Sequence, residues 1–143
     1  MLTPLPVEEA VTEEALAAWA ARFSSMLQPG DVVYLYGDLG TGKTSYVRTC
    51  LTAMMGHPID VPSPTFTLCQ IYDTPQGEVH HYDLYRITSV EDIIELGLRE
   101  HMSSVITFIE WPQLVEAHFP AATYRVTLTH HTPLTRLLSI QGQ

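Results

Sequence analysis

The sequence predicts an α/β fold in which a mixed, mostly parallel central sheet is flanked by helices and carries a β-hairpin insertion. Unbroken apolar runs at 32–36 and 105–109 are typical of strands covered on both faces. A segment with helical spacing follows the first run, and two β-rich segments between the runs flank a turn. The chain has 143 residues, 45% of them hydrophobic and 16% charged, so we expect one domain spanning 1–143.

The first part of the chain predicts a helix, a strand, a loop and a second helix. Residues 12–27 place their apolar side chains on one helical stripe, and Thr12 is a suitable N-cap before two glutamates. After a turn, the strand 32–36 leads into a glycine-bearing loop. Helical spacing then continues to Met54, until Gly56 ends the segment. The side chains expected to be buried on the two helices are Leu16, Trp19, Ala20, Phe23, Leu27, Val47, Cys50, Leu51 and Met54.

The remainder of the chain is richer in strands. Residues 65–72 and 78–85 contain many β-branched and aromatic residues and flank Thr-Pro-Gln-Gly, which predicts a hairpin. A capping box at 88–92 opens a helix that continues to about Leu96. The other expected elements are a strand over 105–109 that ends at Glu110, a short helix between Pro112 and Pro120, and closing strands over 124–129 and 134–140.

The octapeptide GDLGTGKT at 37–44 matches the phosphate-loop pattern G-x-x-x-x-G-K-[ST]. Its glycines let the backbone approach a phosphate, and the N–H groups of the loop and of the following helix form an anion site. Lys43, the single lysine of the chain, supplies a charge for the β- and γ-phosphates, and the Thr44 hydroxyl completes the coordination of Mg²⁺. The motif lies between a buried strand and a helix, as it must, so the sequence predicts a P-loop NTPase-type domain.

Hydrolysis also needs a carboxylate at the carboxyl end of a neighbouring strand. Glu110 ends an apolar run in the position of a Walker-B acid; the alternative is a carboxylate that leaves its strand for solvent. Asp83, in HHYDLYR, is the second candidate, which either holds Mg²⁺ through a water or orients the attacking water. The alternatives for Asp83 are a solvent-facing position and a pairing with Arg86.

Two prolines, Pro62 and Pro64, stiffen the segment before the expected hairpin. A threonine held in this way, Thr65, could reach the γ-phosphate or its Mg²⁺, as switch threonines do in GTPases. The alternative is a loop that is rigid only because a strand follows it.

Composition limits the partners. The 7 basic and 16 acidic residues give a net charge of −9, and without a basic run the chain is not expected to bind nucleic acid directly. No apolar run could span a bilayer and no signal-peptide layout is present, so we expect a cytoplasmic protein without a membrane partner. Cys50 and Cys69 are expected to be free thiols. The adjacent histidines at 80–81 and 130–131 point to opposite strand faces and do not predict zinc.

Five segments in order carry a resemblance to a known family: GDLGTGKTSYVR, VPSPTFTL, HYDLYR, IIELGL and IEWP. They resemble the TsaE (YjeE) family, bacterial ATPases required for threonylcarbamoyladenosine formation on tRNA. The resemblance runs from the Thr12 segment to Arg136, and SPTF, DLYR and IEWP are far more specific than the P-loop. Thr41 and Ser45 stand where the family commonly has alanine and threonine, and both changes are mild.

The resemblance implies a role for each matching position, with ATP and Mg²⁺ as the ligands. The loop holds the phosphates, Thr44 and Glu110 bind Mg²⁺, and Trp111 lies near the site. Thr12 and Arg136 flank the base. The implied catalytic residues are Lys43, Thr65, Asp83 and Glu110, and the nucleotide-binding residues are Gly37, Asp38, Leu39, Gly40, Thr41, Gly42, Lys43, Thr44, Ser45, Trp111, Thr12 and Arg136.

The resemblance also implies partners. The family's ATPase acts in an assembly with the threonylcarbamoyl transferase (TsaD) and its non-catalytic partner (TsaB), and hydrolysis resets that assembly between rounds. We expect weak hydrolysis alone, faster turnover in the complex, and contact with tRNA only through the complex. Two other functions stay open at this point: a small-molecule P-loop kinase, and a nucleotide-sensing module that never hydrolyses its ligand.

Overall fold

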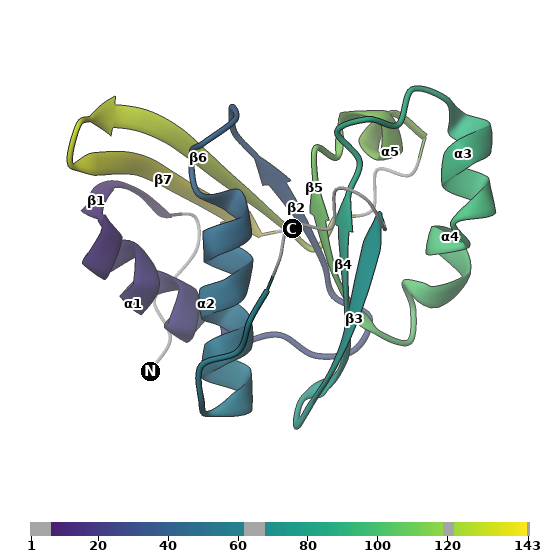
Figure 1. Ribbon diagram of the computed structural model, residues 1–143, viewed down its shortest axis with the longest axis horizontal. Helices are drawn as coiled ribbons and strands as arrows, with labels where there is room; N and C mark the ends of the chain where they lie inside the picture. The colour runs from purple at the N-terminus through teal and green to yellow at the C-terminus, as the bar shows by residue number, and fades with distance from the viewer. Residues whose placement is uncertain (1–6, 62–67, 119–121, 143) are drawn as a thin grey trace.

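The computed structural model describes residues 7–61, 68–118 and 122–142, which form a seven-stranded sheet with helices packed against it (Figure 1). The strands are β1 (Val7–Thr12), β2 (Val32–Tyr36), β3 (Cys69–Thr74), β4 (Gly77–Asp83), β5 (Ile106–Glu110), β6 (Tyr124–Thr132) and β7 (Thr135–Gly142). The helices are α1 (Glu13–Ser24), α2 (Lys43–Met55), α3 (Val90–Glu95), α4 (Leu98–His101) and α5 (Gln113–His118). None of these helices is long and apolar enough to cross a membrane.

The sheet is mixed, with its parallel strands in the middle. The strand order is β1-β7-β6-β2-β5-β4-β3. The pairs β6–β2, β2–β5 and β5–β4 are parallel, whereas the pairs toward the two edges are antiparallel. The predicted fold class is therefore confirmed, and the predicted hairpin, β3–β4, forms one edge of the same sheet. Because β2, β5 and β4 run in one direction, their carboxyl ends meet at one edge of the sheet.

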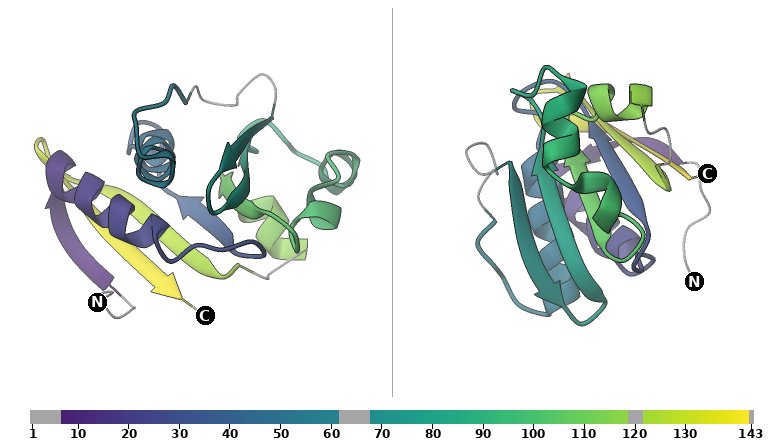
Figure 2. Two further views of the ribbon diagram at one scale, coloured as in Figure 1. Left: turned by 90° about the horizontal axis from the view of Figure 1, so that it is seen from below. Right: turned by 90° about the vertical axis from the view of Figure 1, so that its right-hand side faces the viewer.

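The helices cover the sheet on both faces. Figure 2 shows α1 and α2 along one face, and α3, α4 and α5 on the other side. Two separate apolar clusters correspond to these layers: one joins the sheet to α1 and α2, and the other joins it to α3, α4 and α5. All nine apolar side chains that the sequence predicts to be buried on the first two helices are buried.

Strand β1 and helix α4 differ from the prediction, and several predicted elements have other bounds in the structure, such as β6, which ends at Thr132 rather than at 129. Strand β1 was not expected; it forms because its backbone pairs with β7, with Val7 opposite Ile140 and Thr12 opposite Thr135. Thr12 is the predicted N-cap, and its hydroxyl accepts from Ala15 N at 3.2 Å, but the helix ends at Ser24 rather than at 27. The short helix α4 also lies beyond the predicted elements, where the left-handed Gly97 restarts helical geometry.

A partly exposed hydrogen-bond network joins the end of β2 to α5 and β6. The Tyr36 hydroxyl donates to Glu116 Oε2, and Arg125 Nε donates to the same oxygen at 2.9 Å. These contacts, with the Tyr36 hydrogen bond as the larger cause, lower the pKa of Glu116 below its ordinary value. Because the folded-state pKa is depressed, the stabilisation is present above about pH 4.5 and is lost as the pH falls through the folded pKa.

We therefore expect Glu116→Gln to change the pH dependence of folding. The free energy of unfolding of the variant, measured by urea denaturation, should lie below that of the wild type at pH 7, and the difference should shrink as the pH falls from about 4.5 through the folded-state pKa of Glu116. The exposed Glu95→Gln on α3 is the matched control, since it changes one carboxylate outside such a network. A difference that stays constant across this pH range would contradict the prediction.

Candidate functional site

The predicted phosphate loop connects the carboxyl end of β2 to the first residue of α2. Its glycines adopt the positive φ angles that the turn requires, including +147° at Gly37 and +100° at Gly42. Gly37 lies against β6, and a Cβ there would come within 2.5 Å of the Leu128 carbonyl oxygen. Strand, loop and helix thus have the P-loop NTPase arrangement, with the N–H groups at the start of the 13-residue α2 next to the loop.

A cavity of about 460 Å³ opens beside this loop at the edge where β2, β4 and β5 end. Most residues predicted to hold phosphate and metal line it, together with two residues that follow β4. The lining residues are Leu39, Gly40, Gly42, Lys43, Thr44, Ser45, Asp83, Tyr85, Arg86, Glu110 and Trp111. The structure therefore brings together three segments that are far apart in the chain: the loop, the end of β4 and the end of β5.

Lys43 is folded back into the loop and is only 5% exposed. Its ammonium group donates to the carbonyl oxygens of Gly37 and Asp38 and lies 4.1 Å from the centroid of the Trp111 ring. Burial lowers the pKa of Lys43, and the neighbouring Glu110 carboxylate is the largest of the opposing influences. Trp111 has a φ of +58°, rare for a residue with a side chain, and this backbone holds its ring against the lysine.

Glu110 faces the start of α2 rather than solvent. Its carboxylate oxygens accept from the Thr44 hydroxyl at 3.0 and 2.9 Å, and the residue is 3% exposed. The alternative of a solvent-facing carboxylate is therefore wrong. Thr44 and Glu110, the pair predicted to bind Mg²⁺, come from different elements and meet at the cavity wall.

Asp83 is also buried and is directly opposite Glu110 in the β4–β5 register. One of its oxygens accepts from Tyr85 N at 3.0 Å, which fixes the carboxylate at the point where the chain leaves β4. The solvent-facing alternative is thus wrong for Asp83 as well. The two predicted carboxylates lie side by side on adjacent strand ends, and Arg86 lies on the same cavity wall.

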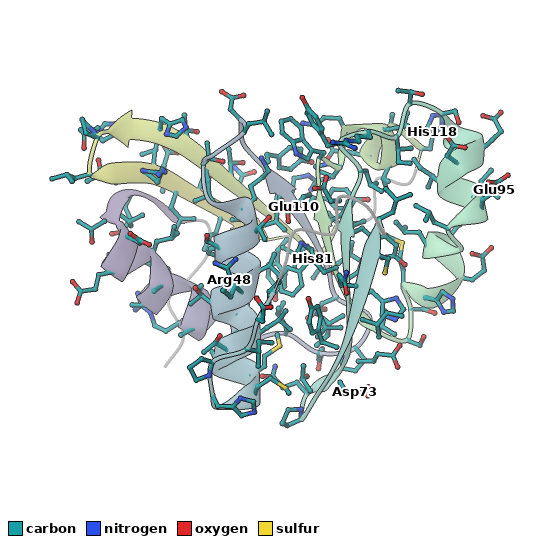
Figure 3. All side chains as sticks on the ribbon, in the orientation of Figure 1. Arg48, Asp73, His81, Glu95, Glu110 and His118 are labelled. Carbon is teal, nitrogen blue, oxygen red and sulfur yellow. The ribbon has the colours of Figure 1, made fainter. Side chains whose placement is uncertain are left out.

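The sequence reasoning missed His81, which is the closest polar neighbour of Glu110. His81 Nε2 lies 2.6 Å from Glu110 Oε2, and both side chains are almost fully buried between β4, β5 and α2 (Figure 3). Strand alternation was the available signal, because His81 and Asp83 are two residues apart and must share a face. His80 points to the other face, where it contacts Glu78 at 2.6 Å.

The donor set fits a hard divalent cation. A carboxylate and a hydroxyl are the oxygen ligands that Mg²⁺ takes from P-loop proteins, while waters and phosphate oxygens complete its coordination. Among the described residues, no group of three or more His, Cys, Asp or Glu side chains is placed to hold a metal alone. A cation at Thr44 and Glu110 would therefore depend on the nucleotide for its other ligands.

A second cavity of about 240 Å³ adjoins the loop from the side of α1 and β7. Arg136 reaches it from β7 and donates through Nε to the Thr41 carbonyl oxygen at 3.3 Å. Thr12 caps α1, and its neighbour Glu13 lines the cavity. The lining residues are Glu13, Leu16, Thr41, Gly42, Ser45, Pro133, Leu134 and Arg136. Thr65 falls outside the residues that the structure describes.

Comparison with known proteins identifies the family and agrees with the fold. The family model described as "Threonylcarbamoyl adenosine biosynthesis protein TsaE" matches residues 10–138. TsaE of Rickettsia bellii is 40% identical over 132 residues, 92% of each chain, and TsaE of Bacillus subtilis is 31% identical over 82% of this chain and 73% of its own. The crystal structure of Bacillus subtilis YdiB has the same fold, with a TM-score of 0.74 over 98% of this chain and 88% of that one at 24% identity. The chain belongs to the TsaE family of tRNA threonylcarbamoyladenosine biosynthesis proteins.

Proposed function

We propose that this protein binds ATP with Mg²⁺ and hydrolyses it to ADP and phosphate as the accessory ATPase of the threonylcarbamoyladenosine machinery. One observation carries the proposal: the P-loop lysine, the Thr44–Glu110 pair and Asp83 line a single cavity at the carboxyl edge of the parallel strands. That edge is where open α/β sheets bind their ligands. Membership of the TsaE family supports a role in threonylcarbamoyladenosine biosynthesis, and the residues that line the cavity support the binding and hydrolysis of ATP.

The loop and the start of α2 bind the phosphates. The backbone N–H groups at the amino end of α2 would bind a phosphate in the cavity, and the positive φ angles of Gly37, Gly40 and Gly42 would let the loop curve around it. Lys43 leaves the two carbonyl oxygens that it now contacts and turns its ammonium toward the β- and γ-phosphates. The face of the Trp111 ring that now contacts Lys43 would then line the phosphate-binding site.

Thr44 and Glu110 are the residues that would hold Mg²⁺. The bound cation supplies charge neutralisation for the phosphate oxygens. Both Glu110 oxygens already have neighbours, since Thr44 and His81 contact them. Asp83 lies opposite Glu110 at the end of the neighbouring strand and lines the same cavity, so we assign Asp83 the orientation of the attacking water. By resemblance, Thr65 serves the γ-phosphate end of the same site.

The second cavity is the place for the base. It adjoins the loop, and Leu16, Pro133 and Leu134 give it apolar walls, which suit a flat heteroaromatic ring. Arg136 ties this cavity to the loop through the Thr41 carbonyl. Thr12 contributes by capping α1, which sets the position of the Glu13 and Leu16 side chains.

The partners follow from the family and from charge. We assign the threonylcarbamoyl transferase TsaD and its partner TsaB as the proteins that this chain serves, with the cytoplasm as the compartment. With a net charge of −9, the chain is suited to a basic protein surface and unsuited to the phosphate backbone of tRNA. Contact with tRNA is therefore indirect, through the complex.

The test is phosphate release from ATP, measured with and without the purified TsaD–TsaB pair and with Mg²⁺ or EDTA. We expect slow release alone, stimulation of about tenfold or more by the pair, and loss of release in EDTA. ATP binding without release under any partner condition would instead indicate a nucleotide sensor. Transfer of the γ-phosphate to a hydroxyl or nucleotide acceptor would indicate a kinase.

A further inference from the structure

We propose that His81 is a positioning residue that holds the Glu110 carboxylate in the orientation required for the divalent cation. The inference rests on the proposed Mg²⁺ role of Glu110 and extends it to a side chain that lies behind the site and does not line the cavity. His81 does not touch the nucleotide pocket itself, whose wall contains Thr44 and Glu110 but not the histidine.

The contact is short, buried and directional. His81 is fully buried and Glu110 is 3% exposed, so water does not compete for their 2.6 Å contact. A carboxylate oxygen only accepts, so Nε2 of the imidazole carries the hydrogen and donates it. The same oxygen, Oε2, lies 2.9 Å from the Thr44 hydroxyl, so one carboxylate is held from behind by His81 and faces Thr44 in front.

Backbone register explains why the two groups meet. Strands β4 and β5 are parallel, with His81 opposite Phe108 and Asp83 opposite Glu110. The side chains of His81 and Glu110 both emerge on the α2 face, because positions of equal parity share a face on each strand. The contact thus joins two adjacent strands, and the backbone pairing of β4 with β5 fixes the positions of both His81 and Glu110.

The other ring nitrogen argues against a purely structural role. Nδ1 of His81 is buried and has no hydrogen-bond partner among the described residues. A buried polar atom without a partner costs stability, so an apolar side chain would suit this core position better. The hydrogen bond from Nε2 of His81 to the Glu110 carboxylate explains why a polar side chain occupies this position. Side chains behind a metal ligand that orient it commonly change metal affinity by about 10–100-fold when removed.

The experiment compares His81→Leu, which removes the donor, with His81→Gln, which retains an N–H. Calorimetry would measure the affinity of each protein for AMP-PNP, a non-hydrolysable ATP analogue, in EDTA and in Mg²⁺. For His81→Leu we expect the EDTA affinity to stay within about twofold of the wild type while the gain in affinity conferred by Mg²⁺ falls about tenfold. His81→Gln should recover part of that gain.

His80→Leu is the matched control. His80 lies one residue away on the same strand, is also buried, at 4% exposure, and also contacts a glutamate, but Glu78 lies on the other face of the sheet. We expect it to leave the Mg²⁺-dependent gain unchanged. In a Glu110→Gln background, His81→Leu should have no further effect on that gain, because the group it positions has lost its charge.

A wild-type measurement covers the case in which His81→Leu does not fold. Side-chain ¹⁵N spectra should show the His81 Nε2 resonance moving when Mg²⁺ is added to the AMP-PNP complex, and His80 should move less. Equal Mg²⁺ gains in all variants, a parallel fall in the EDTA affinity, or an unmoved His81 resonance would overturn the inference. A wild type that fails to bind AMP-PNP would instead overturn the proposed function.

Discussion

Lys43→Ala is expected to lower partner-stimulated ATP turnover by at least about 10²-fold, because it removes the single lysine ammonium group of the chain, which we propose binds the transferring phosphate. The other basic side chain on the same cavity wall, Arg86, follows β4 and cannot replace an ammonium at the start of α2. The measurement is phosphate release in the presence of the transferase pair. The free energy of unfolding should change little, because the cost of burying the ammonium group offsets the stabilisation from its hydrogen bonds to the loop.

Arg22→Ala is the control for this variant. Arg22 is a cation on α1 that stacks 4.1 Å from the Trp19 ring, and it lines neither cavity. Its loss removes one positive charge from the chain while leaving the loop intact, so turnover should stay within about twofold of the wild type. Turnover by Lys43→Ala at the level of Arg22→Ala would contradict the assignment of the lysine to the phosphates.

Gly37→Ala is expected to destabilise the fold by roughly 3 kcal/mol or more. The new Cβ would lie 2.5 Å from the Leu128 carbonyl oxygen and 2.6 Å from the Thr41 hydroxyl, and the φ of +147° already disfavours a side chain. The oxygen belongs to the backbone of β6, in the middle of the sheet, and cannot move aside cheaply. Urea denaturation measures the loss, and nucleotide binding should disappear with it.

Gly40→Ala separates the steric effect from the backbone effect. Gly40 is in the same loop with a φ of +78°, but a Cβ there would meet no atom within 4 Å. Only the cost of the left-handed backbone remains, about 1 kcal/mol. Equal losses for the two variants would show that the approach of the loop to β6 does not determine stability.

Much of the site was predictable because it depends on local sequence. The P-loop motif specifies its own strand, turn and helix, and the carboxylates that end β4 and β5 are preceded by apolar or aromatic runs that mark the strands. Helix α1 was predictable for the same reason: its buried stripe and the Thr12 cap are both short-range signals. The pairing of β4 with β5, which is a long-range feature, then places Asp83 opposite Glu110.

Most of the missed features depend on pairing over long distances, whereas the missed helix α4 depends on the local left-handed geometry of Gly97. Strand β1 contains two exposed glutamates and is a strand only because β7 provides a hydrogen-bonding edge. The sequence marks His81 only as one of two adjacent histidines, because its contact with Glu110 forms only when β4 and β5 are in register. The Arg136 contact with Thr41 joins residues 95 positions apart, a distance over which no local pattern gives a signal.

The folded-back lysine also has a consequence for chemical labelling. Lys43 carries the only ε-amine in the chain, and burial favours the unprotonated, nucleophilic form of that amine. A reagent that delivers an acyl group from a nucleotide phosphate therefore finds a single internal target, at the position where we propose that the phosphates bind. The fraction of the Lys43 peptide that carries one added acyl group then measures the fraction of molecules that had bound the reagent. A competing ligand lowers this labelled fraction in proportion to its own occupancy.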